Sequence, residues 1–196
     1  ASAIVTAQGP AVALSAPGVA RHLSDAPVGA SVSVTGIPAR PPPAGRAGMQ
    51  VRRRFLDLAG QPLALDALRQ GTVFVLLLEG RAETGEAHRA LLQQGLPAGW
   101  EILGRLPAGE VAGMPWLGTL SGAAAIPALD DRLAAALDLT PERPEFRIAA
   151  RLRAVTAGRF ELPGALLEDM YRPAIFARQN AGRISVLPAE EPGGGR

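Results

Sequence analysis

The chain has 196 residues, 47% of them hydrophobic, and is therefore long enough for one domain with a substantial core. Its 20 basic residues are all arginine and face 18 acidic ones, and the resulting net charge of +2 gives no support to nucleic-acid binding. Cysteine is absent, which excludes a disulfide, a thiolate nucleophile and a cysteine-bound metal.

Short strand patterns open the chain. Runs of strand-forming residues lie at 4–6 and 12–15, and an alternating run covers 28–34. Residues 1–27 are therefore assigned to N-terminal strands or an extension. Residues 38–48 are rich in proline and glycine and predict a stiff loop with polyproline character.

The middle of the chain predicts a packed sheet. Met49–Leu58 has a strand pattern, whereas Leu65–Arg69 is expected to form at most one or two helical turns. Thr72–Gly80 is the most hydrophobic run and does not alternate, which is typical of a central strand buried on both faces. Two further strands are predicted, at 87–93 and 100–103.

Three consecutive arginines, Arg52, Arg53 and Arg54, form the densest basic cluster. On a strand their side chains point to alternate faces, and no aromatic platform for stacking bases accompanies them. We interpret them as a solvated strand edge, since charged edges also discourage aggregation.

Residues 104–130 lose periodicity and fill with Gly, Ala and Pro around one bulky cluster at 114–117. Loops of this length are usually functional or wrap over a surface. We expect Trp116 to anchor the loop on the fold, because burying an indole contributes on the order of 2–3 kcal/mol. The alternative is an adhesion or carbohydrate-binding module in which this loop forms the binding surface and Trp100 and Trp116 supply the aromatic contacts.

The last third of the chain predicts paired strands. Residues 132–139 and 146–155 are expected to form an antiparallel pair, residues 175–177 and 183–187 a closing hairpin, and residues 189–196 a disordered tail. Together the patterns predict an all-β fold, an immunoglobulin-like antiparallel β-sandwich with extra strands and at most one or two short helices.

Groups that could carry catalysis are sparse. His22 and His88 are the only histidines, and neither lies in a nucleophile-elbow or metal-binding motif, so each is interpreted as a surface or strand histidine. Adjacent acids such as Glu168 and Asp169 point apart on a strand, which predicts solvated charge rather than a carboxylate pair for hydrolysis. The sequence therefore predicts no enzyme activity, no cofactor and no metal.

Tyr171 is the only tyrosine. It follows an alternating segment at 151–163 that predicts two half-buried strands around a tight corner, and Pro163 ends that pattern. Met170, Tyr171 and Pro173 are therefore expected on a loop or single turn at one end of a sheet. A lone tyrosine in such a place often anchors its own sandwich through a hydroxyl-to-backbone hydrogen bond, as in a tyrosine corner.

Several segments resemble the bacterial alpha-2-macroglobulins and occur in the same order as in that family. They are residues 54–63, 96–102, 131–139, 153–165 and 168–173. The resemblance spans residues 28–187, more than a chance match at one motif would cover. It implies that residues 28–188 form the C-terminal macroglobulin-like β-sandwich domain of such a protein.

Family members are large periplasmic proteins that trap proteases. A protease cuts their bait segment, and in many of them a strained Cys–Gln thioester then acylates the protease. The resemblance implies that this domain is non-catalytic and packs on the thioester domain of a parent protein. In thioester-bearing members the tyrosine of a Met-Tyr-x-Pro stretch shields the thioester from water. That role would fall to Tyr171, with Met170 and Pro173 shaping the loop and Arg172 either solvated or paired across the interface.

The implied partners are the other domains of the parent, the thioester domain above all, and target proteases bound through the parent. Nucleic acid is not expected as a partner, because the net charge is only +2. Direct membrane insertion is not expected either, because no signal peptide and no run of 18 apolar residues is found within the chain. The resemblance implies a periplasmic location and leaves open a lipid anchor that holds the parent on the inner membrane.

Overall fold

The computed structural model describes residues 25, 27, 40–125 and 131–190. The chain divides into two units between Ile37 and Pro38, and the fold below belongs to the second. The strands predicted at 4–6, 12–15 and 28–34, His22 and most of the predicted tail lie outside the described residues.

The described residues form thirteen strands and one 3-10 turn, η1 (Pro115–Leu117). The strands are β1 (Gly45–Ala47), β2 (Met49–Leu56), β3 (Leu68–Arg69), β4 (Val73–Ala82), β5 (His88–Gly95), β6 (Trp100–Arg105), β7 (Ala124–Ala125), β8 (Arg132–Leu139), β9 (Glu145–Ala154), β10 (Gly158–Leu162), β11 (Ala165–Asp169), β12 (Phe176–Arg178) and β13 (Gly182–Leu187). Over the described part of the chain, no helix has the length and hydropathy needed to cross a membrane.

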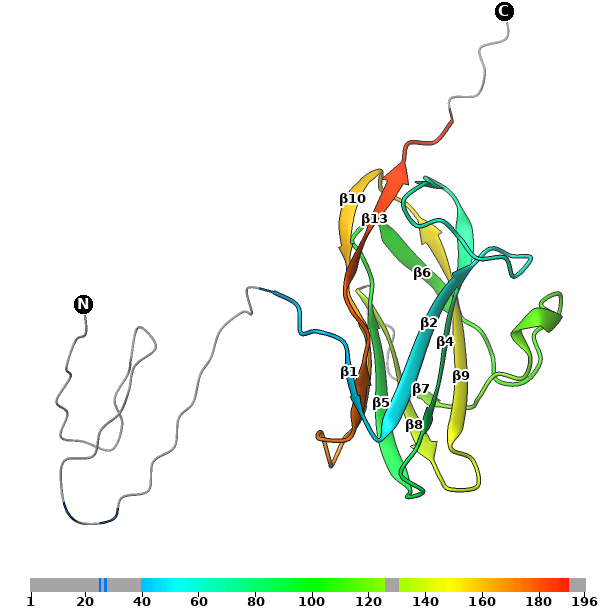
Figure 1. The fold of residues 1–196 in the computed structure, drawn as a ribbon. Coiled ribbons are helices and arrows are strands. Elements are labelled where there is room, and N and C mark those ends of the chain that lie inside the picture. Colours follow the sequence, from blue (N-terminus) through cyan, green and yellow to red (C-terminus); the bar gives the residue numbers. More distant parts are fainter. Residues whose placement is uncertain (1–24, 26, 28–39, 126–130, 191–196) are drawn as a thin grey trace, which may run out of the picture. The chain divides into compact units, whose positions relative to one another are not determined.

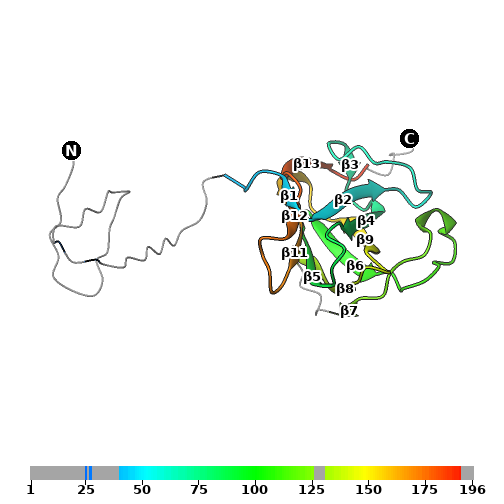
Figure 2. The ribbon, with the colours of Figure 1, turned by 60° about the horizontal axis from the view of Figure 1, so that its bottom comes forward.

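Three sheets make up the sandwich (Figures 1 and 2). One has six strands in the order β1-β12-β11-β5-β8-β7, one has four in the order β2-β4-β9-β6, and a small one has three in the order β10-β13-β3. Side chains from all three sheets enter the main core. Described strand pairs are antiparallel apart from β3 with β13, which is parallel. The predicted all-β sandwich is confirmed.

The prediction of a central strand at 72–80 is also confirmed. β4 lies between β2 and β9, and Phe74–Leu78 are fully buried. Phe74 and Leu76 enter the main core between the sheets. Val75 and Leu77 point to the opposite face, where a second apolar cluster covers them. The run does not alternate because both of its faces are covered.

That second cover comes from the long loop after β6. Four of its residues pack on the outer face of β2, β4 and β9: Leu106, Met114, Leu117 and Leu120. Trp116 is only half-buried and lies beside Gly60, where an added Cβ would come within 2.7 Å of the indole. The loop therefore wraps over a surface as predicted, but Met114, Leu117 and Leu120 are buried more deeply than Trp116.

Two predicted strand pairings are wrong, although the strands themselves exist. β8 and β9 match the predicted pair, yet β8 pairs with β5 and β7 while β9 pairs with β4 and β6. β12 and β13 match the predicted hairpin and also belong to different sheets. In a sandwich the chain often crosses between sheets, so the next strand in sequence need not be the pairing partner.

Local differences from the predictions have local causes. Leu65–Arg69 is not helical; it contains a turn followed by β3, which pairs with β13. Residues 45–47, predicted as part of a proline loop, form β1 because they pair with β12 at the edge of the six-stranded sheet. Residues 165–169, for which no strand was predicted, form β11.

The arginine cluster lies on β2, the edge strand of the four-stranded sheet. The alternation is as predicted, but the interpretation as a solvated edge fits only the exposed Arg52. Arg54 pairs with Glu79 at 2.8 Å. Arg53 is half-buried and donates to Gln94 Oε1 at 3.0 Å and to the carbonyl of Pro163. Burial lowers the pKa of the Arg53 guanidinium to about 10.

Candidate functional site

Tyr171 lies where the sequence predicts it, on the loop that joins β11 to β12 at one end of the six-stranded sheet. The tyrosine is 77% exposed and the neighbouring Met170 is 46% exposed, which makes them adjacent large apolar residues open to solvent. Pro173 lies in the turn that returns the chain to β12. The structure thus brings Met170, Tyr171, Arg172 and Pro173 together on one short loop.

The residue before the loop, Asp169, fixes how the chain leaves β11. Its side chain is 2% exposed, and Oδ1 accepts the backbone N–H of Tyr171 at 2.9 Å and that of Arg172 at 3.0 Å. An aspartate that caps the next amides in this way forms an Asx-type turn. Asp169 was predicted as solvated charge, and that prediction is wrong because the carboxylate turns into the fold.

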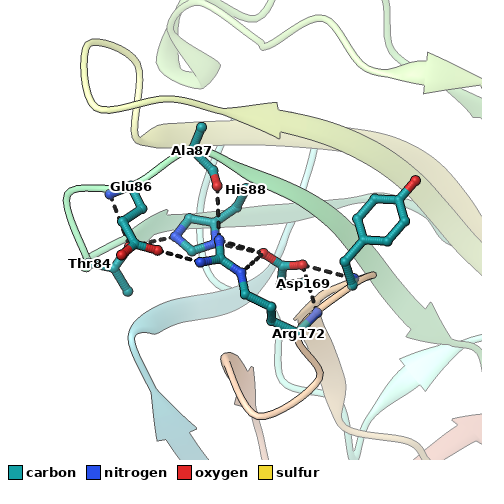
Figure 3. Close-up of polar contacts among 7 residues, drawn as sticks. Thr84, Glu86, Ala87, His88, Asp169 and Arg172 are labelled. Carbon is teal, nitrogen blue, oxygen red and sulfur yellow. Dashed lines mark hydrogen bonds and ion pairs between the residues drawn. The ribbon is translucent and has the colours of Figure 1, made fainter.

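Asp169 Oδ2 meets His88 from the neighbouring strand β5. The distance from His88 Nδ1 to Oδ2 is 2.7 Å, and His88 Nε2 lies 2.5 Å from the Thr84 hydroxyl (Figure 3). An ionised carboxylate can only accept, so His88 Nδ1 is the donor in its contact with Asp169. His88 is on a strand, as predicted, but it is 3% exposed and thus not a surface residue.

Arg172 folds back over this pair, although 42% of its side chain remains exposed. Its guanidinium donates to Asp169 Oδ2 at 3.1 Å from Nη2, to the carbonyl of Ala87 at 3.0 Å, and to Glu86 in a close ion pair. Nη2 also lies 2.9 Å from His88 Nδ1. Arg172 was expected to be solvated or paired across an interface; in the structure it is exposed and its guanidinium is paired within the domain.

We call Thr84, Glu86, His88, Asp169 and Arg172 the loop brace. They come from the β4–β5 connection with the start of β5, and from the end of β11 with its loop, so the brace joins two segments that are far apart in sequence (Figure 3). The prediction of the Tyr171 loop did not include the brace. The signal that could have pointed to it is an aspartate that directly precedes a turn and is followed by an arginine three positions later.

The brace changes the acidity of its members. Burial alone would raise the pKa of the Asp169 carboxyl, but hydrogen bonds from His88, from the backbone of Tyr171 and Arg172, and from the Arg172 guanidinium lower it to about 2. Hydrogen bonds to Glu86 and then to Asp169 raise the pKa of Arg172. Asp169 is therefore ionised although it is buried.

The line from Thr84 through His88 to Asp169 has the connectivity of a nucleophile, base and acid triad. Two features distinguish this arrangement from a catalytic triad. Arg172 sits on the carboxylate and neutralises its charge, and the Thr84 hydroxyl already accepts the N–H of Glu86 at 3.2 Å. Both oxygens of Asp169 are used within the domain, so the arrangement is suited to holding the loop.

The two tryptophans do not form an exposed aromatic platform. Trp100 is 4% exposed and packs edge-on against Phe55 and Phe74, with ring centroids 5.2 and 4.9 Å away. Trp116 is half-buried against the second apolar cluster. The carbohydrate-binding alternative required these residues at the surface, so the structure does not favour it.

The fold and the site define the class of protein: an immunoglobulin-like β-sandwich module that presents an exposed Met-Tyr loop on a buried polar brace. Residues 48–174 match the bacterial alpha-2-macroglobulin MG10 domain. On this match, which covers more than half of the chain, the protein belongs to the bacterial alpha-2-macroglobulin family.

Relatives in sequence and in structure agree with this assignment. An alpha-2-macroglobulin of Xylella fastidiosa is 33% identical over 173 residues, which cover 82% of this chain and 10% of the relative. That of Escherichia coli is 28% identical over 159 residues, which cover 76% of this chain and 10% of the relative. The chain thus spans about a tenth of the length of the curated relatives it matches.

Two solved structures of relatives show the same fold. Escherichia coli alpha-2-macroglobulin activated by porcine elastase matches with a TM-score of 0.67 and 28% identity, over 78% of this chain and 14% of that one. Salmonella alpha-2-macroglobulin reacted with methylamine matches with a TM-score of 0.66 and 26% identity, over 78% of this chain and 10% of that one. In both relatives this fold is one domain of a larger chain.

Proposed function

We propose that the chain is the terminal, non-catalytic domain of a periplasmic protease-trapping inhibitor, and that its β11–β12 loop packs on and shields the thioester domain of the parent. Membership of the family supports the coarser part of this proposal. Further support comes from two relatives, one activated by porcine elastase and one reacted with methylamine, which are a protease and a small amine nucleophile.

The observation that carries the shielding role is the exposure of Tyr171. A tyrosine that is 77% exposed beside a half-exposed methionine leaves apolar area in water that a second domain could cover. The loop is short and its base is held by the brace, so the ring is presented without a large entropy cost. The exposed Met170 and Tyr171 therefore form a surface suited to contact with another domain of the parent protein.

The tyrosine-corner alternative does not fit the geometry. Such a corner needs the hydroxyl to bond to backbone of its own sandwich. The Tyr171 hydroxyl has no hydrogen-bond partner among the described residues, and most of the side chain is in solvent. Only the backbone N–H of this residue is tied down, through Asp169.

Shielding also makes chemical sense. A thioester is an electrophile that water and amines attack, so an inhibitor that waits for its target needs the bond covered until activation. One face of an aromatic ring excludes water while the hydroxyl stays solvated. A loop at the end of a sheet can withdraw when domains shift.

The test uses a thioester-bearing parent protein with Tyr171→Gly. Before any protease is added, the variant is expected to consume methylamine about tenfold faster, which corresponds to a barrier lowered by about 1.4 kcal/mol. Tyr171→Phe keeps the ring and should retain most of the protection. Leu58→Gly, which removes an exposed apolar side chain from a distant loop, is the control for nonspecific loosening. Equal rates in the Gly variant and the wild type would refute shielding.

A further inference from the structure

We propose that Asp169 is the positioning residue of the Tyr171 loop, and that it acts through His88 and Arg172 to tie the loop to the connection between β4 and β5. The consequence for the thioester rests on the proposed function. The positioning itself is a property of this chain and can be measured without a thioester.

The first step concerns the backbone of the loop. The ladder between β11 and β5 continues as far as Met170, whose N–H donates to the carbonyl of Arg89 at 2.9 Å. At Tyr171 the chain leaves the sheet, and its N–H has no strand partner; the Asp169 carboxylate accepts it instead. Asp169 therefore determines the direction in which the tyrosine departs from the strand.

The second step concerns how Asp169 is itself held. A buried carboxylate is costly unless it is paired and fully hydrogen-bonded. Here the contacts form a closed circuit: Asp169 to His88 at 2.7 Å, His88 to the Thr84 hydroxyl at 2.5 Å, Thr84 to the N–H of Glu86 at 3.2 Å, Glu86 to Arg172, and Arg172 back to Asp169 at 3.1 Å (Figure 3). In such a circuit each bond restricts the others, so the Tyr171 loop and the β4–β5 connection are held together as one unit.

The third step is a comparison with Glu79, another partly buried carboxylate that is held by arginine. Glu79 is 18% exposed and is held by Arg54 at 2.8 Å and Arg147 at 2.7 Å on the outer face of the four-stranded sheet. Like Asp169 it is a carboxylate paired with arginine, here with two of them, but the contacts described for it include none to the β11–β12 loop. Glu79→Gln is therefore a matched control that disturbs an ion network without touching the loop.

The first experiment is amide hydrogen exchange in the 196-residue chain, whose main core lies within residues 49–186. In Asp169→Ala the amides of Tyr171 and Arg172 should exchange at least about tenfold faster, since each loses a hydrogen bond to a charged acceptor. Asp169→Asn keeps an oxygen that can accept these N–H groups, so its exchange rates at Tyr171 and Arg172 should lie between those of the wild type and of Asp169→Ala. Unchanged exchange at both amides in Asp169→Ala, or an equal increase in Glu79→Gln, would overturn the proposal.

The second experiment measures methylamine consumption by the parent before protease is added. Asp169→Ala should approach the rate of Tyr171→Gly, because a displaced ring shields as poorly as a missing one, whereas Glu79→Gln should react like the wild type. A faster rate in Tyr171→Gly without any change in Asp169→Ala overturns positioning and leaves shielding intact. Faster exchange in Asp169→Ala with no effect of Tyr171→Gly on methylamine overturns shielding and leaves positioning intact.

A milder variant keeps the test decisive if Asp169→Ala does not fold. Glu86→Gln weakens the ion pair with Arg172 at the exposed side of the brace and leaves the buried atoms in place. It should speed exchange at the Tyr171 amide by a few-fold, and exchange equal to that of the wild type would count against the brace.

Discussion

At the scale of single residues, Asp169 combines burial with ionisation, and this makes its contribution to stability depend on pH. Its pKa in the folded state, about 2, lies below the ordinary value of 3.8. Burial acts against this shift, and the donors His88, Tyr171 N–H, Arg172 N–H and the guanidinium outweigh it. A carboxyl whose folded pKa is depressed stabilises the fold above its unfolded pKa and loses that contribution as pH falls through the folded pKa.

We therefore expect Asp169→Asn to be less stable than the wild type near neutral pH, by roughly 1–2 kcal/mol. The difference should persist down to about pH 4 and then shrink as the pH approaches 2, the folded-state value. Chemical denaturation of both proteins between pH 7 and pH 2 measures it. A difference that stays constant over the whole range would contradict the assignment of an ionised Asp169.

The same residues mark where sequence reasoning reaches its limit. The loop at Tyr171 could be predicted because Pro163 and Gly164 stop the strand pattern locally and the run that follows is too short and interrupted for a long helix. The brace could not, because His88 and Asp169 are 81 positions apart and meet only through the pairing of β5 with β11. Asp169 was predicted to be solvated because adjacent acidic residues on a strand point apart. That reasoning failed because Asp169, at the end of β11, is the one of the pair that is buried.

At the scale of elements, the loop after β6 covers one face of the four-stranded sheet. Leu117 is fully buried in the second apolar cluster, on the face that Val75 and Leu77 present outward. Leu117→Ala is expected to lower the free energy of unfolding by about 2–4 kcal/mol, since it leaves a cavity under the loop. Leu103→Ala, at the irregular part of β6 and 45% exposed, should change it by less than about 0.5 kcal/mol.

Chemical denaturation of the two leucine variants tests this cover directly. Equal effects of Leu117→Ala and Leu103→Ala would mean that the loop is not packed on the sheet. Proteolysis within residues 106–121 should also become faster in Leu117→Ala, because the loop loses its main anchor.

Elements were predictable where one segment carries its own signal. The run of β4 lacks alternation because it is covered on both faces, and this property is visible in sequence. Strand partners were not predictable, because β8 and β9 follow one another along the chain and yet lie in different sheets. β11 was missed since Pro163 and Gly164 end the preceding pattern and only five residues follow before the loop.

At the scale of the whole molecule, the domain is a sandwich whose function depends on what it is attached to. It contains no cysteine and so cannot supply a thioester, and it contains no lysine and so offers no side-chain amine to one. Its proposed contribution is a surface at one end. For that surface to hold its shape the two main sheets must keep their relative position, and a part-buried polar contact from the edge strand β2 joins them.

Arg53 on β2 makes that contact, with Gln94 on β5 and the carbonyl of Pro163 just before β11. Gln94 is fully buried, so removing its charged donor leaves its Oε1 unpaired in the core. Arg53→Met keeps most of the side-chain volume and should lower the free energy of unfolding by about 1–3 kcal/mol. Arg52→Met, one position earlier and exposed, should stay within about 0.5 kcal/mol of the wild type.

The double variant Arg53→Met with Gln94→Leu separates a lost contact from lost volume. If the cost of Arg53→Met is the unpaired Gln94 oxygen, adding Gln94→Leu should cost less in the Arg53→Met background than in the wild type, by about 1 kcal/mol or more. Chemical denaturation of the four proteins in this cycle gives the coupling energy. Strict additivity would show that Arg53 and Gln94 stabilise the domain independently and do not join its sheets.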